Sequence, residues 1–287
     1  MRTADAILTA DLHLRDTTPR CRTDDYFHAQ ELKLKYIETL SVQLDCPIIV
    51  AGDFLHTPRV SPFLEGWLIK NLRLSRWHTI TGQHDLINHS LKQYEHSSLH
   101  VLEQAGLNVY KNEVEGNIYG GAIFCELNII AIHTMVYLNK PIHESVGGTS
   151  ASNLLYEMDA DTAKLLLTGD NHQTFTYERD GRIVLNPGSM MRMTADQLHH
   201  KPCIFVWHKD ERVLKQHYLP INEGCINREH FGKQEQRDHR IDAFLNRLNT
   251  NYEIGLSFEK NIEKYFSKNK TRKPVQETVW EAVRHGN

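Results

Sequence analysis

Short apolar runs along the first third of the chain alternate with segments that have a helical repeat. Residues 5–10, 47–51 and 77–81 are predicted strands, because each is a short buried-type run. Residues 29–44 carry apolar positions at helical spacing, and Ser61-Pro62 is a favourable start for a helix reaching about Leu74. This alternation predicts a parallel or mixed sheet with covering helices.

The pattern becomes richer in strands after a predicted helix at residues 96–105, which Gly106 ends. Strands are predicted at residues 107–110, 117–123, 127–132 and 163–168. Residues 134–153 are small and polar with one proline and two glycines, which predicts a long loop over the candidate site. Two hairpins are expected, at residues 174–185 and 202–219.

The character of the chain changes at about residue 221, so we expect two domains, residues 1–220 and a charged helical extension at 221–287. Helices are predicted there near residues 236–248, 257–266 and 275–285. Residues 264–273 hold five cations with Tyr265 and Phe266 among them. This run is either a solvated face or a nucleic-acid contact in which an aromatic ring stacks on a base.

Composition narrows the class of protein. Of 287 residues, 40% are hydrophobic and 24% charged, which is typical of a soluble globular protein. The net charge of −3 gives no global signature for nucleic acid, so such binding would need a local patch. Five scattered cysteines show no Cys-x-x-Cys spacing, and no signal peptide or membrane-length apolar run occurs. These features predict a cytoplasmic protein without membrane association.

Polar clusters follow the predicted strands. After the third strand come Gln83, His84 and Asp85, on a turn opened by Gly82. Strand-end loops of α/β sheets are where such folds bind ligands. Four other clusters also follow apolar runs: Asp11-Leu12-His13, Gly52-Asp53, His133 and Gly169-Asp170-Asn171-His172.

Each cluster has a plainer interpretation when it is taken alone. Alternation along a strand end would send Asp11 and His13 to the same side, where they could share a metal or simply hydrogen-bond to each other. A lone histidine such as His133 is more often structural than a ligand. Together, however, the clusters supply the carboxylate, amide and imidazole ligands that two divalent ions about 3.5–4 Å apart require. Such a pair activates water and clamps a phosphoryl centre.

The order Asp-x-His, Gly-Asp, Gly-Gln-His-Asp, His and Gly-Asp-x-His resembles the calcineurin-like metallophosphoesterase superfamily over residues 5–190. Residues 51–62 and 186–192 look most like the SbcD-type DNA repair nucleases, and the size is that of a short, phage-like version. The resemblance implies an α/β fold: a metallophosphoesterase-type two-sheet β-sandwich flanked by helices, here with a small C-terminal helical appendage.

The resemblance also implies a role for each cluster. The implied metal ligands are Asp11, His13 and His172 for one ion, Asp53 as the bridge, and Gln83, His133 and Asp170 for the other. His84 would contact the scissile phosphate and either protonate the leaving oxygen or stabilise its charge, with Asp85 orienting His84. His56 matches a position where some of these nucleases carry a histidine beside the metals.

Two residues depart from the family pattern. Gln83 stands where asparagine is expected, and Asp170 stands where a histidine is expected. Both favour harder ions, Mn²⁺ first and Mg²⁺ second, over Zn²⁺. They also leave room for a degenerate site. A separate alternative is that Asp170 only caps a turn while Asn171 or water fills the coordination position.

Three functions remain open at this point. The first is a Mn²⁺-dependent DNA exonuclease or endonuclease of recombination or repair, with DNA and an SMC-like ATPase as partners and a homodimer as one possible assembly. The second is a phosphodiesterase or phosphatase acting on small nucleotides or phosphoproteins, which the near-neutral charge favours. The third is a scaffold without activity, against which the retained His84 argues.

Overall fold

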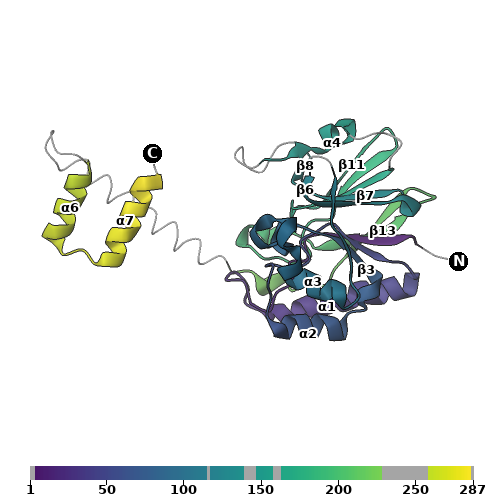
Figure 1. Ribbon diagram of the computed structural model, residues 1–287, viewed down its shortest axis with the longest axis horizontal. Coiled ribbons are helices and arrows are strands. Elements are labelled where there is room, and N and C mark those ends of the chain that lie inside the picture. Colours follow the sequence, from purple (N-terminus) through teal and green to yellow (C-terminus); the bar gives the residue numbers. More distant parts are fainter. Residues whose placement is uncertain (1–3, 115–116, 139–146, 158–162, 228–257, 286–287) are drawn as a thin grey trace. The chain divides into compact units, whose positions relative to one another are not determined.

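The computed structural model describes residues 4–114, 117–138, 147–157, 163–227 and 258–285 (Figure 1). The chain divides into two compact units, residues 1–226 and 227–287. The first unit contains two six-stranded sheets with helices on their outer faces. The predicted fold class, an α/β sandwich of two sheets flanked by helices, is therefore confirmed. The prediction that the C-terminal extension is a separate domain stays a prediction.

The first sheet has the strand order β14-β13-β1-β2-β3-β4. Its strands are β1 (Ala6–Thr9), β2 (Ile48–Val50), β3 (Trp77–Ile80), β4 (Asn108–Tyr110), β13 (Cys203–His208) and β14 (Val213–Tyr218). Strands β1, β2, β3 and β4 run parallel to one another. Strand β13 pairs with β1 in the antiparallel direction, and β14 pairs in the same way with β13. Parallel neighbours need crossover connections, which places helices between them in the sequence.

Those crossovers are α1 (Tyr26–Leu44), α2 (Pro62–Asn71) and α3 (Ser98–Gln104). The side chain of Ser61 accepts a hydrogen bond from the Leu64 N–H and caps α2, as the Ser-Pro pair predicts. The first helix begins three residues earlier than its apolar repeat indicates, because Asp25 caps it by accepting from the His28 N–H. Apolar residues of all three helices pack on the outer face of the sheet.

The second sheet has the strand order β11-β12-β10-β7-β6-β5. Its strands are β5 (Asn112–Val114), β6 (Asn117–Phe124), β7 (Ile129–His133), β10 (Leu165–Gly169), β11 (Phe175–Arg179) and β12 (Arg182–Asn186). Strands β7, β10 and β12 are parallel neighbours, so their carboxyl ends share one edge. Both predicted hairpins, β11–β12 and β13–β14, are confirmed.

The prediction of a long loop at residues 134–153 is wrong for the two ends of this segment, which the structure describes. Strands β8 (Val136–Tyr137) and β9 (Thr149–Ser150) pair in parallel, and α4 (Ala151–Glu157) follows directly. Residues 139–146 lie outside the described part of the chain. Packing of its apolar side stabilises α4, because Leu154 and Leu155 contact Ile130 and Val184 on the outer face of the second sheet.

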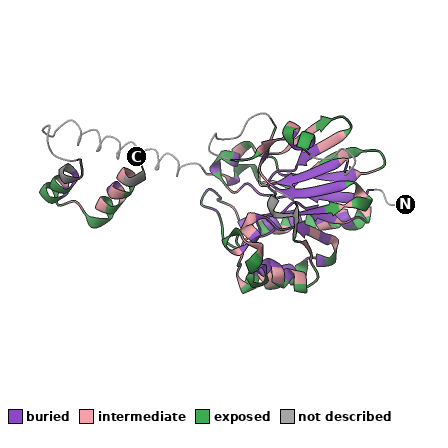
Figure 2. Cartoon of the chain, turned by 45° about the horizontal axis from the view of Figure 1, so that its top comes forward, coloured by how far each residue is buried: buried purple, intermediate pink, exposed green. Residues whose placement is uncertain are grey.

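The two sheets face each other across a closely packed core. Alanines alternate with larger residues there, so Ala6, Ala10 and Ala131 pack beside Leu8 and Leu165. Figure 2 shows these strands as the most buried part of the molecule. Because β1, β2 and β3 end at one edge of their sheet, and β7 and β10 at one edge of theirs, the polar clusters that follow these strands can converge.

The C-terminal unit contains α6 (Phe258–Asn269) and α7 (Lys273–His285), so the two predicted helices in this region are confirmed. They pack through Ile262, Phe266 and Val279. The helix predicted at residues 236–248 lies outside the described residues. No helix in the part of the chain that the structure describes is long and apolar enough to cross a membrane.

Candidate metal centre

Tight left-handed turns, rather than strand alternation, place the first candidate ligands. Strand β1 ends at Thr9, and Asp11 and His13 have φ angles of 48° and 45°. Asp53 and Asp170 are also left-handed, with φ angles of 50° and 75°. Residues other than glycine adopt this conformation at a cost in conformational energy, and such strained residues are often found at functional sites. The expected convergence of Asp11 and His13 is observed, but the predicted cause is wrong.

Asp11 and His13, which are buried, form a cluster with the half-buried His172, and their ligand atoms lie within 4.8 Å of one another. The Nε2 atoms of His13 and His172 are 3.1 Å apart, although these residues are 159 positions apart in the chain. The Oδ2 atom of Asp11 is buried and has no hydrogen-bond partner in the described structure. This is the ligand set that the resemblance implies for one ion.

Asp53 lies between this cluster and His133. Its Oδ2 atom is 3.6 Å from Nε2 of His13 and 3.4 Å from Nε2 of His133. Its other oxygen accepts a hydrogen bond of 2.9 Å from the His84 backbone N–H. The Nδ1 atom of His133 donates to the Ala51 carbonyl at 2.7 Å, which turns Nε2 towards Asp53. The predicted bridging carboxylate, Asp53, thus lies between imidazoles of the two implied ligand sets.

Asp170 belongs to the same site. Its Oδ1 atom accepts a hydrogen bond of 2.5 Å from Gln83 Nε2, and its backbone N–H donates to Asp11 Oδ1 at 3.0 Å. Gln83 Oε1 is buried without a partner among the described residues. Asn171 is used elsewhere, because its Nδ2 donates to the Val136 carbonyl at 2.6 Å and its Oδ1, the atom that could bind a metal, accepts from the Gln173 N–H at 3.0 Å. The alternative in which Asn171 replaces Asp170 as a ligand is thus disfavoured.

Two glycines let the strand ends close around His133. A Cβ atom on Gly52, which has a φ of 83°, would lie 2.5 Å from Nδ1 of His133. A Cβ atom on Gly169 would lie 2.6 Å from the same nitrogen. Any side chain at either position would displace the imidazole from Asp53.

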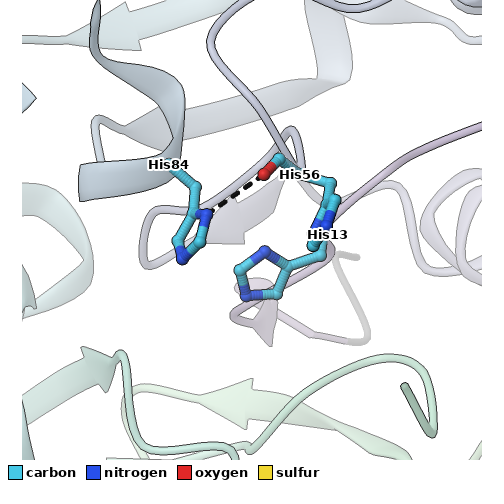
Figure 3. Close-up of side chains that lie close together, drawn as sticks. All are labelled: His13, His56 and His84. Atoms are coloured by element: carbon cyan, nitrogen blue, oxygen red, sulfur yellow. Dashed lines mark hydrogen bonds between the residues drawn. The ribbon is translucent and has the colours of Figure 1, made fainter. Parts of the chain in front are cut away.

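A second histidine group lies beside the ligand clusters. One ring nitrogen each of His13, His56 and His84 lie within 4.8 Å of one another, and the rings of His56 and His84 are stacked (Figure 3). His84 Nδ1 donates to the backbone carbonyl of His56 at 3.0 Å, which leaves Nε2 for a substrate. The predicted active-site positions of His56 and His84 are thus next to the candidate ligands.

Asp85 does not orient His84, contrary to the prediction. Its buried carboxylate accepts backbone N–H groups instead, from Leu55 at 2.8 Å, Gly82 at 2.9 Å and Phe54 at 3.2 Å. The carbonyl of His56 orients His84 in its place. Asp85 therefore ties the loops after β2 and β3 together, and it acts on the site through the backbone.

Burial and charge oppose each other in this site. Burial raises the pKa of Asp11 to about 6 and that of Asp85 to about 7. Burial would also raise the pKa of Asp53, but His133 and His13 outweigh it and hold that pKa below its usual range. Burial would lower the pKa of His133, but Asp53 raises it to about 10. The buried carboxylates of Asp11 and Asp53 thus favour a positive charge in this site.

The donor set fits two divalent ions. Asp11 Oδ2, Gln83 Oε1 and His133 Nε2 are buried atoms without hydrogen-bond partners in the described structure, as ligand atoms aimed at an ion would be. Oxygen and imidazole donors are mixed, which suits Mn²⁺ or Mg²⁺ better than a thiolate-preferring ion. The residues that would hold the ions are the seven implied by the resemblance. Their roles as ligands stay predictions.

Sequence reasoning missed Arg15 and the cleft beside the site. Arg15 Nη1 donates to Nε2 of His56 at 2.8 Å. Its only signal in the sequence is a cation two positions after His13. An open cleft of about 740 Å³ begins at Asp170 and His172 and is lined by residues of β11 and β14. Strands β11 and β14 are edge strands of two different sheets, and local sequence patterns do not show that they line one cleft.

No known protein-family profile and no curated protein matches the chain. Similar solved structures include an archaeal phosphodiesterase, at 14% identity and a TM-score of 0.42, which covers 75% of this chain and 99% of its own. Vacuolar protein sorting 29 from Cryptosporidium parvum has 14% identity and a TM-score of 0.38, covering 76% and 99%. A metallophosphoesterase from Sphaerobacter thermophilus has 12% identity and a TM-score of 0.38, covering 76% and 89%. Similarities of this size carry no argument about function, which rests on the geometry of the site.

Proposed function

We propose that the protein is a two-metal-dependent phosphodiester hydrolase. One observation carries the proposal: the buried carboxylate of Asp53 lies between His13 and His133, 3.6 and 3.4 Å from their Nε2 atoms. Asp11 and His172 complete one side, and Gln83 with Asp170 completes the other. A carboxylate shared by two such ligand sets is the arrangement that two neighbouring divalent ions need.

The protein's own residues then divide the work. Two divalent ions, when bound, supply Lewis acidity to the phosphoryl group and to the attacking water. His84, held through Nδ1, presents Nε2 to the substrate and gives a proton to the oxygen that leaves phosphorus. The backbone N–H of His84 fixes Asp53, so one loop positions both the bridging carboxylate and the acid. Water bonds to phosphorus and releases one proton to the solvent as the ester P–O bond breaks, and the leaving oxygen takes the proton that doubly protonated His84 carries on Nε2.

We propose further that the substrate is DNA, in recombination or repair. Support comes from residues 51–62 and 186–192, whose sequence resembles the SbcD-type nucleases. The second of these segments packs on the site, because the Met190 N–H donates to the carbonyl of Asp11 at 3.2 Å. The cations at residues 264–273 offer the local patch that a chain of net charge −3 needs. An SMC-like ATPase partner belongs to the same proposal.

The second candidate is a phosphodiesterase acting on small nucleotides. The open cleft beside Asp170 and His172 favours it, because about 740 Å³ is enough for a small organic substrate. Phe175, His199 and Tyr218 line that cleft and can contact a base. A scaffold without activity remains the third candidate, and the retained His84, held through Nδ1 with Nε2 left for a substrate, argues against it.

One experiment separates these functions. The purified protein, with added Mn²⁺, is tested on plasmid DNA and on bis-p-nitrophenyl phosphate. Cleavage of both substrates supports the nuclease, and cleavage of the small diester alone supports the phosphodiesterase. No turnover of either substrate with Mn²⁺ or Mg²⁺, in protein shown by calorimetry to bind the ions, supports the scaffold and contradicts the proposal.

A further inference from the structure

Arg15 is held beside the metal centre by the first helix. Its backbone N–H donates to Gln30 Oε1 at 3.1 Å, and Gln30 Nε2 donates back to the Arg15 carbonyl at 2.6 Å. Gln30 lies on α1 and is only 2% exposed. Leu14, the preceding residue, pairs with Leu55, so this loop also lies against the loop that carries His56. The position of Arg15 is therefore built into the fold.

The guanidinium of Arg15 keeps hydrogen-bonding capacity and an unbalanced charge. Its Nε donates to Thr17 Oγ1 and its Nη1 to His56 Nε2, both at 2.8 Å, which leaves Nη2 available. No carboxylate among the described residues forms an ion pair with it. Its neighbour Asp16 accepts a hydrogen bond from the Ser61 hydroxyl instead. The loop thus presents a fixed positive charge at the rim of the site.

His56 adds a second donor to this place. A guanidinium can only donate, so Nε2 of His56 must accept, and the proton of the neutral ring is on Nδ1. That Nδ1 is buried and has no hydrogen-bond partner in the described structure. A buried donor without an acceptor is costly, so the site calls for a group that accepts hydrogen bonds.

The ligand that suits this place is an anion. The grouping of His13, His56 and His84 resembles a metal site, but Arg15 would repel a cation there and already occupies Nε2 of His56. A phosphate satisfies both features, because arginine pairs with phosphate through parallel N–H groups and its oxygens accept from imidazole. His56 is not one of the implied metal ligands, and its ring centre is 5.6 Å from that of His13, so this phosphate would lie beside the candidate ligand set.

We propose that Arg15 and His56 form a second phosphate subsite, which binds the phosphate adjoining the scissile one in a polynucleotide. The inference rests on the proposed hydrolase function and deepens it by naming the substrate class. It gives the enzyme a preference for chains with two or more phosphates over small diesters. A single arginine supplies this preference locally, which a chain of net charge −3 could not supply by its overall field.

The test compares two substrates in Arg15→Gln, Arg15→Lys and the wild-type protein. Bis-p-nitrophenyl phosphate has one phosphate, and the trinucleotide TpTpT has two. We expect Arg15→Gln to raise KM for TpTpT about 10- to 100-fold, with a smaller change on the small diester, and Arg15→Lys to recover part of the difference. Arg20→Gln is the matched control, because Arg20 is an exposed cation on the same loop and should leave the substrate ratio unchanged.

Two results would overturn the subsite. One is an equal loss of activity on both substrates in Arg15→Gln, provided that this variant unfolds at the same temperature as the wild-type protein. The other is a change in the substrate ratio of Arg20→Gln that equals the change in Arg15→Gln. If wild-type protein hydrolyses neither substrate, the proposed function fails, and the subsite is then decided by calorimetric binding of the dinucleotide pTpT. Weaker binding of pTpT to Arg15→Gln than to Arg20→Gln supports the subsite, and equal binding refutes it.

Discussion

Individual side chains in this site are held by backbone groups more than by one another. His84 hydrogen-bonds to the His56 carbonyl, His133 to the Ala51 carbonyl, and Asp85 to three backbone N–H groups. Such contacts fix ring orientation and tautomer before any ion or substrate binds. At the residue scale, therefore, the site is pre-organised, and single substitutions should separate binding from chemistry.

The first prediction concerns His84. We expect His84→Ala to lower kcat by about 10²- to 10⁴-fold, because a general acid contributes that much. Metal affinity should be retained, since His84 is outside the implied ligand set and only its backbone N–H contacts Asp53. Turnover of bis-p-nitrophenyl phosphate and calorimetric titration with Mn²⁺ measure the two effects. Near-normal turnover would show that His84 is not the acid.

The second prediction concerns Asp170. Its carboxylate replaces the neutral imidazole of the family pattern, so it should strengthen binding of hard ions and weaken the preference for soft ones. We expect the best activity with Mn²⁺, measurable activity with Mg²⁺ and poor activity with Zn²⁺. Asp170→Ala should lose one of two ions and most activity, whereas Asp170→His should improve the use of Zn²⁺. Unchanged Mn²⁺ stoichiometry and affinity in Asp170→Ala would exclude it as a ligand.

Much of the candidate site could be predicted from the sequence because its members follow strands in a fixed order. Asp53, His133 and His172 were predicted this way, and the fold brings them together. Arg15 was missed, since its importance depends on contact with His56, 41 positions away. Asp85 was misassigned because adjacency in sequence suggested contact with His84, while the backbone turns its carboxylate to Leu55.

Among the elements, α1 connects the outer layer to the site. Its Lys33 is buried, and Nζ donates to the Met190 carbonyl at 2.8 Å. The neighbouring Met190 N–H donates to the Asp11 carbonyl. Burial, with Arg22 and Arg192 nearby, lowers the pKa of Lys33 to about 7. Helix α1 thus contacts the segment beside the site through the Lys33 amine, whose uncharged form is favoured by burial.

The third prediction follows from that pKa. Between about pH 7 and 10 the unfolded chain keeps the Lys33 proton while the folded chain loses it, so this group makes stability rise with pH. The upper limit is about 1.4 kcal/mol per pH unit. Urea unfolding at several pH values should show the rise in wild-type protein and in Lys35→Met, an exposed control on the same helix, but a smaller rise in Lys33→Met. Parallel profiles in all three proteins would contradict the assignment.

Elements with a clear apolar repeat were predicted well, and those defined by tertiary contacts were not. Strands β1 and β2 are short apolar runs, β3 is a β-prone run, and Ser61-Pro62 marks the start of α2 by local chemistry. Helix α4 was missed because it is short and its apolar residues have meaning only against the second sheet. The assignment of strands to two facing sheets came from the resemblance, because local patterns do not record which strands pair.

At the scale of the whole molecule, chemistry and substrate docking should belong to different units. The candidate ligands all lie within residues 11–172, whereas α6, α7 and the turn between them contribute a small apolar core and exposed cations such as Lys264, Lys268 and Arg272. Each cation that contacts a phosphate of double-stranded DNA steepens the fall of the logarithm of the binding constant with the logarithm of the salt concentration by about 0.9. A protein arranged in this way should lose DNA binding without losing the hydrolytic reaction when the second unit is removed.

The last prediction tests that separation by truncation after residue 226. The remaining unit keeps both sheets and every candidate ligand, so hydrolysis of bis-p-nitrophenyl phosphate should be retained. Activity on plasmid DNA should fall, and its salt dependence should become weaker, because phosphate contacts have been removed. The full chain with glutamine at Lys264, Lys268, Lys270, Arg272 and Lys273 is the matched control, and it should reproduce the loss on DNA if charge is the cause. Equal loss of both activities on truncation would place residues 227–287 in the structure or chemistry of the first unit, and full retention of both would remove them from DNA docking.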